Sequence, residues 1–474
     1  MASAPFAQRP EPQPSPAPPP FASPLQADPA LESLLQQASA LLCNWIGGAA
    51  AGQPLPPLSV LPGIEPEAAP LAQERLLADL QLVVDGAYNP HHPGAIAHLD
   101  PPPLTGSIVA ELICAGLNNN LLAEELSPTL SRLERSLGVW LARQLGLPEG
   151  AGGVAASGGS LSNLMALVVA RHQAGLSGDP QAVLLCSSDA HVSFAKALAV
   201  MGLPPTALER LPVDAAGRLD PEALECRLAH CQSSGRPPIA VVATAGTTVC
   251  GAVDPLASIG PLCRRHGVWL HVDGAIGAVF ALAPAHRHRV EGLEWADSVT
   301  VNPQKLLGIT KTSSLLLMAR PALLQQAFAT GLPYMEPSWG GGHGGEAGLQ
   351  GTRPAEILKL WLGLRQLGLE GISAVIDAAV SRRRRLQTLL SAEPRLQLLA
   401  GPLHLLAFRP LRADPAASER WSAATRQALL NAQLMLSRPM HHGHHHLKAV
   451  LGNPHTGEAE LQRLVQIVRA SLDD

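Results

Sequence analysis

The chain has 474 residues, of which 46% are hydrophobic and 15% charged, with a formal net charge of −4. This length suits one large domain with smaller additions, and the composition is typical of a folded protein rather than a disordered one. The slight negative charge argues against nucleic acid or an anionic membrane surface as the main partner.

The cysteines and the apolar runs bear on the compartment. Seven cysteines without CxxC spacing predict neither a disulfide framework nor a zinc site, and they favour a reducing environment. The first residues lack a basic region followed by an apolar core, and no apolar run approaches the ~20 residues that cross a bilayer. We therefore expect a cytoplasmic protein without a membrane partner.

Residues 1–28, MASAPFAQRPEPQPSPAPPPFASPLQAD, are rich in proline. Proline at this density prevents helix formation and sheet pairing, which predicts a disordered or polyproline-like tail; a ligand for a proline-recognition module is the alternative. Residues 29–150 form a predicted N-terminal segment that opens with a helix over residues 30–46. Its later, proline-broken loop carries His91, His92 and His98, for which hydrogen bonding within the loop is the simplest role.

A glycine-rich turn leads into an amphipathic helix over residues 149–170, EGAGGVAASGGSLSNLMALVVA. Glycine lets backbone N–H groups approach an anion closely, and a helix N-terminus favours negative charge. Ser160 adds a hydroxyl at the cap position. The turn is therefore either a phosphate site or an ordinary helix start.

Short apolar runs between residues 182 and 318 are typical of buried strands in an α/β sheet. Helical stretches separate several of them, as parallel crossover connections require. We therefore predict a large α/β domain over residues 151–372. The predicted strands cover residues 182–186, 238–244, 268–272, 298–301 and 313–318.

Two of these runs end in polar residues of opposite charge. Asp273 follows one run, and the sequence NPQK, which ends at Lys305, follows the next. Ligands of α/β sheets lie beyond the carboxyl ends of the strands, so we expect the two side chains to lie near each other. A pyridoxal phosphate enzyme needs this pair, because the lysine holds the aldehyde as a Schiff base and the carboxylate keeps the pyridine nitrogen protonated. An N-cap and a solvated charge are the alternative.

The segments HVDGA, around Asp273, and ADSVTVNPQK, ending at Lys305, resemble the signature of the group II pyridoxal-dependent decarboxylases. That family includes glutamate, cysteine sulfinate, aromatic amino acid and 2,4-diaminobutyrate decarboxylases. The resemblance extends from residue 89 to about residue 470, and its C-terminal pattern is closest to the bacterial diaminobutyrate group.

The resemblance implies a fold-type I pyridoxal phosphate-dependent transferase fold. In that fold a mostly parallel mixed sheet forms the large domain, and residues 373–474 would form a small C-terminal α/β domain. It also implies pyridoxal 5'-phosphate as cofactor, an L-amino acid as substrate, release of carbon dioxide, and a homodimer.

The resemblance also assigns residues to the cofactor. Lys305 is expected to be the Schiff-base lysine, His191 to stack on the pyridine ring, and Asp273 to stabilise the protonated ring; these three are the expected catalytic residues. In the Gly-Thr-Thr turn we assign Thr248, with Thr247 as the alternative. The expected cofactor-binding set is Gly158, Gly159 and Ser160 at the phosphate, Asn163 close behind, and His191, Thr248, Asp273, Ala275, Asn302 and Lys305.

Two positions depart from the family pattern. Gln304 stands where the family usually has histidine, and glutamine cannot take up a proton. The glycine-rich segment 330–356 is expected to close over the substrate, but Tyr334 is its one tyrosine and lies at its start, where the family often carries a proton-donating tyrosine further along. These departures leave two alternatives open: an aminotransferase or aldimine-based amine oxidase on the same fold, and a catalytically impaired homologue that acts as a binding or scaffold protein.

His98 and Lys448 are the candidates for substrate contacts, together with the prolines at 101–103. Lys448 falls where glutamate and cysteine sulfinate decarboxylases carry an arginine, and a lysine point charge cannot replace a bidentate fork. With Glu346 in the closing segment, this favours a small substrate with a polar or cationic side chain, such as 2,4-diaminobutyrate. A small acidic substrate paired with Lys448 is the alternative.

A histidine run, HHGHHH, lies at residues 441–446. Clustered histidines can bind metal. Hairpin loops tolerate such runs, however, and no acidic partner is adjacent in the sequence, so we predict no metal site.

Overall fold

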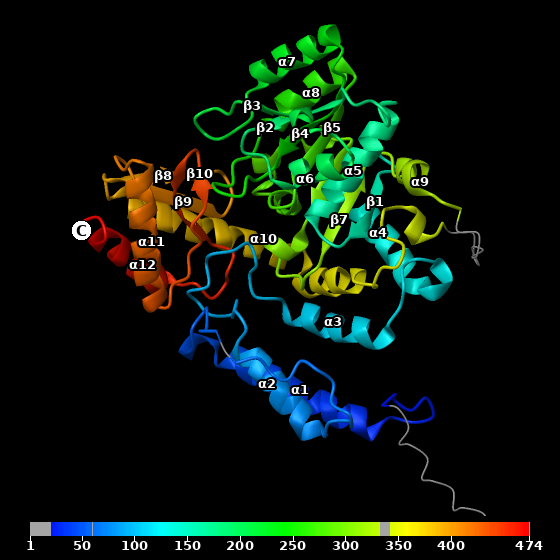
Figure 1. The fold of residues 1–474 in the computed structure, drawn as a ribbon, viewed down its shortest axis with the longest axis vertical. Coiled ribbons are helices and arrows are strands. Elements are labelled where there is room, and N and C mark those ends of the chain that lie inside the picture. Colours follow the sequence, from blue (N-terminus) through cyan, green and yellow to red (C-terminus); the bar gives the residue numbers. More distant parts are fainter. Residues whose placement is uncertain (1–19, 59, 332–341, 474) are drawn as a thin grey trace, which may run out of the picture. The chain divides into compact units, whose positions relative to one another are not determined.

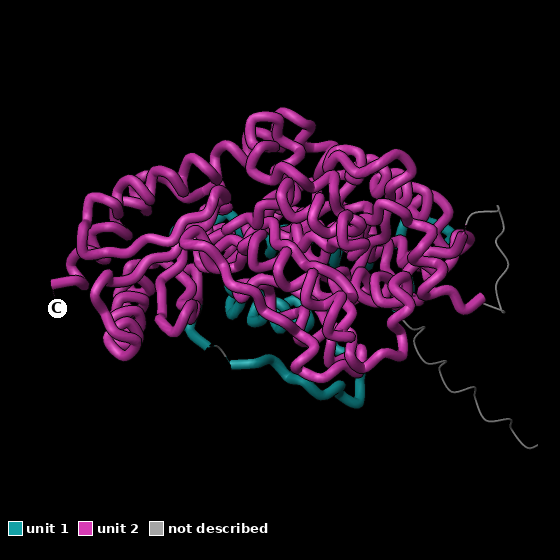
Figure 2. The backbone as a smooth tube through the Cα atoms, turned by 90° about the horizontal axis from the view of Figure 1, so that it is seen from above, with its two compact units in different colours: residues 1–52, 56–88 teal, residues 53–55, 89–474 magenta. Residues whose placement is uncertain are grey.

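The computed structural model describes residues 20–58, 60–331 and 342–473, so Tyr334 and most of the proline-rich segment 1–28 lie outside the described residues. The chain forms two compact units (Figure 2). The first covers residues 1–52 and 56–88, and the second covers residues 53–55 and 89–474. None of the helices in the described ranges is both long and apolar enough to cross a membrane.

The first unit contains two helices, α1 (Pro29–Gly47) and α2 (Gln73–Asp85), as the helical spacing of residues 30–46 predicts for α1. Helix α1 begins at Pro29 because the carboxylate of Asp28 accepts hydrogen bonds of 3.0 Å from the N–H groups of Ala30 and Leu31. Neither helix contains a buried residue, so both keep an apolar face that this unit does not cover.

A seven-stranded sheet forms the centre of the second unit, with the order β1-β7-β6-β5-β4-β2-β3 (Figure 1). Strands β2 to β6 pair in parallel, whereas β7 is antiparallel to both β6 and β1. This mixed, mostly parallel sheet confirms the predicted fold class. The strands are β1 (Gly152–Ala156), β2 (Val183–Ser187), β3 (Leu208–Leu211), β4 (Pro238–Thr244), β5 (Trp269–Gly274), β6 (Ser298–Val301) and β7 (Ser314–Met318).

Alternate residues of the central strands pack into two separate apolar cores, as the period of two in a strand requires. In β4, Val241 and Ala243 belong to one core, while Ala240 and Val242 belong to the other. Helices α4 (Pro128–Gln144), α7 (Pro221–Ser234) and α8 (Leu256–His266) cover the first core. Helices α5 (Gly159–Gln173), α6 (Ser193–Val200) and α9 (Ala322–Phe328) cover the second.

Helix α10 (Ile357–Ser391) joins the large sheet to the C-terminal elements. It kinks at Gly368, whose φ of +61° lies in the left-handed region that favours glycine. Before the kink α10 packs on α3 (Thr105–Leu117) and α4, and further along it contacts β8 and α12 (Figure 1).

The C-terminal elements form a third core around an antiparallel sheet of order β12-β9-β8. They are β8 (Leu396–Leu399), β9 (Leu405–Pro410), α11 (Pro415–Asn431), the hairpin β10 (Met440–His441) and β11 (His444–His445), β12 (Leu447–Val450) and α12 (Glu458–Ala470). Because one compact unit contains residues 89–474, the predicted domain boundaries at residues 150 and 372 stay predictions.

Candidate active site

The carboxyl ends of the parallel strands β4, β5 and β6 and the N-terminus of α5 surround a cavity of about 230 Å³. This is the edge at which ligands of α/β sheets bind. The lining residues are Gly159, Ser160, Asn163, His191, Thr244, Gly246, Thr247, Thr248, Asp273, Ala275, Ile276, Asn302 and Lys305.

The cavity brings together every residue that the resemblance assigns to the cofactor except Gly158. Gly158 is the residue before α5 and has a φ of +145°, which favours glycine. Both threonines of the Gly-Thr-Thr turn, Thr247 and Thr248, line the cavity, so the structure does not separate these alternatives. The individual roles of these residues stay predictions.

Lys305 ends a short 3-10 turn, Pro303–Lys305, directly after β6. Burial lowers the pKa of Lys305, partly opposed by the carboxylates of Asp273 and Asp100. A lowered pKa increases the fraction of neutral amine, which is the form that attacks a carbonyl carbon. Two other lysines lie elsewhere: Lys196 is exposed on α6, and Lys311 pairs with Asp100 at 3.2 Å.

Asp273 is held in place by Asn163 rather than by a cation. Its Oδ2 accepts a hydrogen bond of 3.1 Å from Nδ2 of Asn163, and its Oδ1 accepts one of 3.2 Å from the N–H of Ala275. Sequence resemblance placed Asn163 behind the phosphate. In the structure its amide nitrogen donates to Asp273 and to Ser193 Oγ, the latter also at 3.1 Å, and its place relative to the phosphate stays a prediction.

The orientation of the Asn163 amide follows from two buried donors on its oxygen side. Oδ1 accepts hydrogen bonds from Thr300 Oγ1 at 2.7 Å and from His271 Nε2 at 3.0 Å. On the far side of the imidazole, His271 Nδ1 lies 2.9 Å from Ser298 Oγ. We assign the proton of His271 to Nε2 on the basis of this network, because only that tautomer donates to Asn163. Burial lowers the pKa of His271 to about 4, so the ring is neutral near pH 7.

His191 has its tautomer fixed in the same way. Its Nδ1 accepts a hydrogen bond of 3.2 Å from the backbone N–H of Ser193 and lies 2.9 Å from Ser193 Oγ. Since a backbone N–H can only donate, the proton of neutral His191 is on Nε2. Burial is the largest cause that lowers the pKa of His191, and Lys305 lowers it further while Asp273 opposes the shift.

The polar residues of this network alternate along two neighbouring buried strands. His271 and Asp273 on β5 pair in register with Ser298 and Thr300 on β6. Sequence reasoning missed His271, Ser298 and Thr300. Polar residues at every second position of otherwise apolar runs are the signal that could have found them.

The N-terminus of α5 closes the other side of the cavity. A Cβ added at Gly159 would lie 3.1 Å from Nδ2 of Asn302, so a larger residue here would push on the Asn302 side chain. Ser314 donates a hydrogen bond of 2.8 Å to Asn302 Oδ1 and fixes that amide. The free backbone N–H groups at a helix start, with Ser160, suit a phosphate.

Gln304 does not belong to the cavity lining. Its Oε1 accepts a hydrogen bond of 2.5 Å from the N–H of Ser313, so the side chain holds the segment after Lys305 instead. Because glutamine cannot take up a proton, proton transfer in this cavity would need a residue other than Gln304.

The candidate substrate residues lie around the cavity without lining it. Lys448 is 6% exposed, and its Nζ donates a hydrogen bond of 3.2 Å to the carbonyl oxygen of Thr248. Burial lowers the pKa of Lys448 to about 8, and the ammonium of Lys305 contributes. His98 is exposed at the surface, but part of its ring is shielded from water, and this partial burial is the largest cause that lowers its pKa. The nearby charge of Lys448 lowers the pKa further, and Asp100 opposes the shift.

Two further candidates have other contacts. Pro102 packs on Gly308, three residues after Lys305, where an added Cβ would lie 2.9 Å from the Pro102 carbonyl oxygen. Glu346 is buried, and its carboxylate accepts hydrogen bonds from the N–H groups of Thr330 and Gly331 at 2.8 and 2.9 Å. Glu346 therefore holds the backbone at Thr330 and Gly331 and is not directed at a substrate.

The donor set of the cavity fits pyridoxal phosphate. An amine, Lys305, and a carboxylate, Asp273, face one space together with the half-buried imidazole of His191. A helix N-terminus with glycine and serine supplies the anion-binding end. Buried Asp273 has no cationic hydrogen-bond partner among the described side chains, which leaves its charge available to a protonated pyridine nitrogen.

Comparison with known proteins supports the same assignment. The pyridoxal-dependent decarboxylase conserved domain matches residues 57–409. L-2,4-diaminobutyrate decarboxylase of Rhizobium meliloti (strain 1021) is 32% identical over 384 residues, which cover 80% of this chain and 77% of that protein. Cysteine sulfinic acid decarboxylase of Rattus norvegicus is 33% identical over 347 residues, covering 70% and 69% respectively.

Solved structures share the fold over nearly the whole chain. A crystal structure of mouse CSAD matches with a TM-score of 0.86 and 26% identity, covering 94% of this chain and 99% of that one. The predicted cofactor, pyridoxal 5'-phosphate, and the predicted amino acid decarboxylase activity are thereby confirmed. The chain belongs to the pyridoxal-dependent decarboxylase family.

Proposed function

We propose that this decarboxylase acts on a small L-amino acid with an acidic side chain, and that Lys448 binds that side chain. The observation that carries this proposal is the position of Lys448, buried and hydrogen-bonded to Thr248, which lines the cavity. Asp273 is the one carboxylate among the described lining residues, and Asn163 and Ala275 already bind it. A cationic side chain would meet Lys448 and Lys305 without a free carboxylate, and like charges in a poorly solvated site repel strongly.

This proposal differs from the preference that the sequence alone suggests. Without a structure, the absence of an arginine at position 448 favoured a polar or cationic substrate. Burial of Lys448 changes the balance, because a single ammonium that is shielded from water pairs more strongly with a carboxylate or sulfinate than an exposed one does.

The residues of the cavity have separate roles in the reaction. When bound, pyridoxal phosphate supplies an acceptor for the electron pair left behind as carbon dioxide departs. Asp273 would keep the pyridine nitrogen protonated, and Asn163 holds that carboxylate in one orientation. His191 presents Nε2–H on the cavity side, where it can hold the substrate carboxylate or move a proton.

L-2,4-diaminobutyrate is the second candidate substrate. The observation in its favour is that two relatives with this name, from Rhizobium meliloti and Acinetobacter baumannii, are 32% and 30% identical to the chain. Lys448 lacks the bidentate geometry that binds a second carboxylate most tightly, which also favours this candidate.

A substrate panel separates the two candidates. We would measure kcat/KM by carbon dioxide release for aspartate, cysteine sulfinate, glutamate, 2,4-diaminobutyrate and an aromatic amino acid. We expect kcat/KM for a small acidic substrate to exceed that for diaminobutyrate by at least tenfold, which corresponds to about 1.4 kcal/mol of transition-state preference. Replacement of Lys448 by Gln should remove this preference. If diaminobutyrate leads, the second candidate is correct.

We also propose a homodimer. Helix α3 exposes an apolar stripe at spacings of three and four residues, formed by Val109, Leu112, Ile113 and Leu117, each about half exposed. Such a stripe is typical of an interface. A second copy of the chain is the proposed cover, and the exposed apolar residues of α1 and α2 are consistent with it. Sedimentation of the wild type and of Leu112→Asp tests this, with a shift of the variant toward monomer as the expected result.

A cytoplasmic location completes the proposal. All seven cysteines lie in described parts of the chain and are free thiols, and four of them are buried. Such thiols are typical of a reducing compartment. Fractionation of the native cell would test it.

A further inference from the structure

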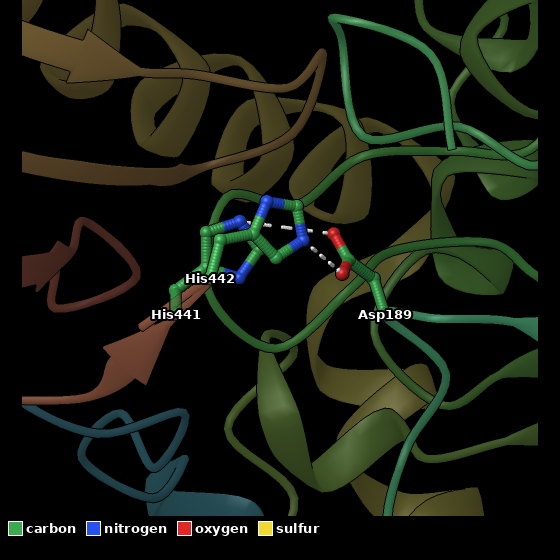
Figure 3. Close-up of side chains that lie close together, drawn as sticks. All are labelled: Asp189, His441 and His442. Carbon is green, nitrogen blue, oxygen red and sulfur yellow. Dashed lines mark hydrogen bonds and ion pairs between the residues drawn. The ribbon is translucent and has the colours of Figure 1, made fainter. Parts of the chain in front are cut away.

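We propose that Asp189, His441 and His442 form a binding site for a divalent cation of the zinc class, apart from the cofactor cavity. Asp189 follows β2, whereas the two histidines belong to the β10–β11 hairpin, 253 positions later for His442. One ligand atom from each of the three side chains lies within 4.8 Å of the other two (Figure 3). Folding therefore supplies the acidic partner that the histidine run lacks in the sequence.

The carboxylate of Asp189 is buried but incompletely bonded. Its side chain is 5% exposed, and its Oδ2 has no hydrogen-bond partner among the described residues. Oδ1 accepts a hydrogen bond of 2.8 Å from His442 Nε2, and His441 Nε2 lies 3.7 Å from Oδ2. A buried carboxylate oxygen without a partner costs free energy, which a bound cation would remove.

The histidines have the chemistry and the freedom that ligation needs. Histidine binds zinc through a ring nitrogen, and Nε2 of His441 lies 3.7 Å from Oδ2 of Asp189. The rings of His441 and His442 are stacked, with centroids 3.9 Å apart, so one ring must turn for both lone pairs to converge. His442 can do so, because its side chain is 59% exposed.

The ligand types select the cation. Two imidazoles and one carboxylate suit zinc and related transition metals, whereas magnesium and calcium prefer sets of oxygen ligands. Both histidines also line a cavity of about 460 Å³, which leaves room for water as a fourth ligand. Asp189 lies two residues before His191, so a bound cation would tie the hairpin to the loop that carries this active-site histidine.

The test begins with tag-free holoenzyme that a chelator has stripped of metal. Zinc chloride is then titrated into this protein, and isothermal titration calorimetry measures its binding. We expect one zinc per chain in the wild type. Asp189→Asn and His442→Ala should each raise the dissociation constant by about 100-fold or more, because each removes a direct ligand and the loss of an outer-shell partner alone costs roughly 10–100-fold. His444→Ala is the matched control, because it leaves as many histidines in the hairpin as His442→Ala does. Its affinity for zinc should stay within threefold of that of the wild type.

Three results would overturn the proposal. No zinc uptake by the wild type would mean that the three side chains form only a hydrogen-bonded contact. Unchanged affinity in both Asp189→Asn and His442→Ala would place the zinc elsewhere. Equal losses in His442→Ala and His444→Ala would mean that the histidine run binds zinc without a defined site. Because His442 is exposed, its variant should fold even if Asp189→Asn does not.

Discussion

The amide nitrogen of Asn163 donates a hydrogen bond of 3.1 Å to the carboxylate of Asp273, and the amide oxygen accepts from His271 and Thr300 on two neighbouring strands. Asn163 therefore links α5 to β5 and β6 and fixes the one carboxylate of the cavity. The same amide reaches Ser193, which contacts Nδ1 of His191. Two expected catalytic residues thus depend on a single amide for their orientation.

Replacement of Asn163 by Leu should reduce both activity and stability. The variant keeps a similar volume but leaves the His271 and Thr300 donors without an acceptor, at a cost of about 1–3 kcal/mol each. Chemical denaturation measures this loss. Turnover should fall by about tenfold or more because Asp273 and His191 lose their orientation. Wild-type turnover in Asn163→Leu would contradict the positioning role of this amide.

Replacement of Asp273 by Asn should retain cofactor and lose turnover. The substitution preserves shape but removes the charge that stabilises a protonated pyridine nitrogen, so kcat should fall by about 100-fold or more. Absorbance of bound cofactor provides the control for binding. Decarboxylation at the wild-type rate would show that another residue faces the ring nitrogen.

Lys448 should give the reaction of an acidic substrate a pH limit. Because burial lowers the pKa of Lys448 to about 8, its ammonium is present below that pH and is lost above it. We expect kcat/KM for an acidic substrate to decline as the pH rises through about 8. Lys448→Arg should extend the plateau upward, since guanidinium stays charged. An identical decline in wild type and Lys448→Arg would mean that a different group titrates.

His271 should make the fold sensitive to acid. Its pKa is lowered from an ordinary value of 6.5 to about 4 by burial, so the unfolded chain binds this proton first as the pH falls. The stability that neutral His271 contributes is complete above about pH 6.5 and declines between 6.5 and 4. Urea unfolding of wild type and His271→Gln would check this, and the difference between them should shrink over that pH interval. A constant difference would contradict the prediction.

Much of the sheet was predictable because its strands are short apolar runs closed by polar residues. The runs at 238–244 and 298–301 match β4 and β6 fully. Two strands were missed. β1, GGVAA, has the composition of a turn, yet Gly153 is needed because an added Cβ would collide with the backbone of Leu316 on β7. β3, LERL, alternates with charged residues and gives little apolar signal.

The residues of the site were also predictable where a local sequence pattern marks them. Lys305, Asp273 and the start of α5 could be identified because each follows a local pattern at a strand end or helix start. Contacts that depend on the packing of distant segments could not be identified in this way. Examples are the hydrogen bond from the Asn163 amide to Asp273, and the contacts of Asp189 with two histidines of a hairpin far along the chain. Glu346 was expected near the substrate, but its carboxylate binds Thr330 and Gly331, a local arrangement that residue type alone does not reveal.

The central prediction is that Lys305 holds the cofactor. Reduction of the holoenzyme with borohydride, followed by peptide mapping, locates the lysine that carries the pyridoxyl group. We predict a single label on Lys305 and none in a folded Lys305→Ala variant, with Lys196 and Lys311 unmodified in both. A label on Lys196 or Lys311 in the wild type would contradict it.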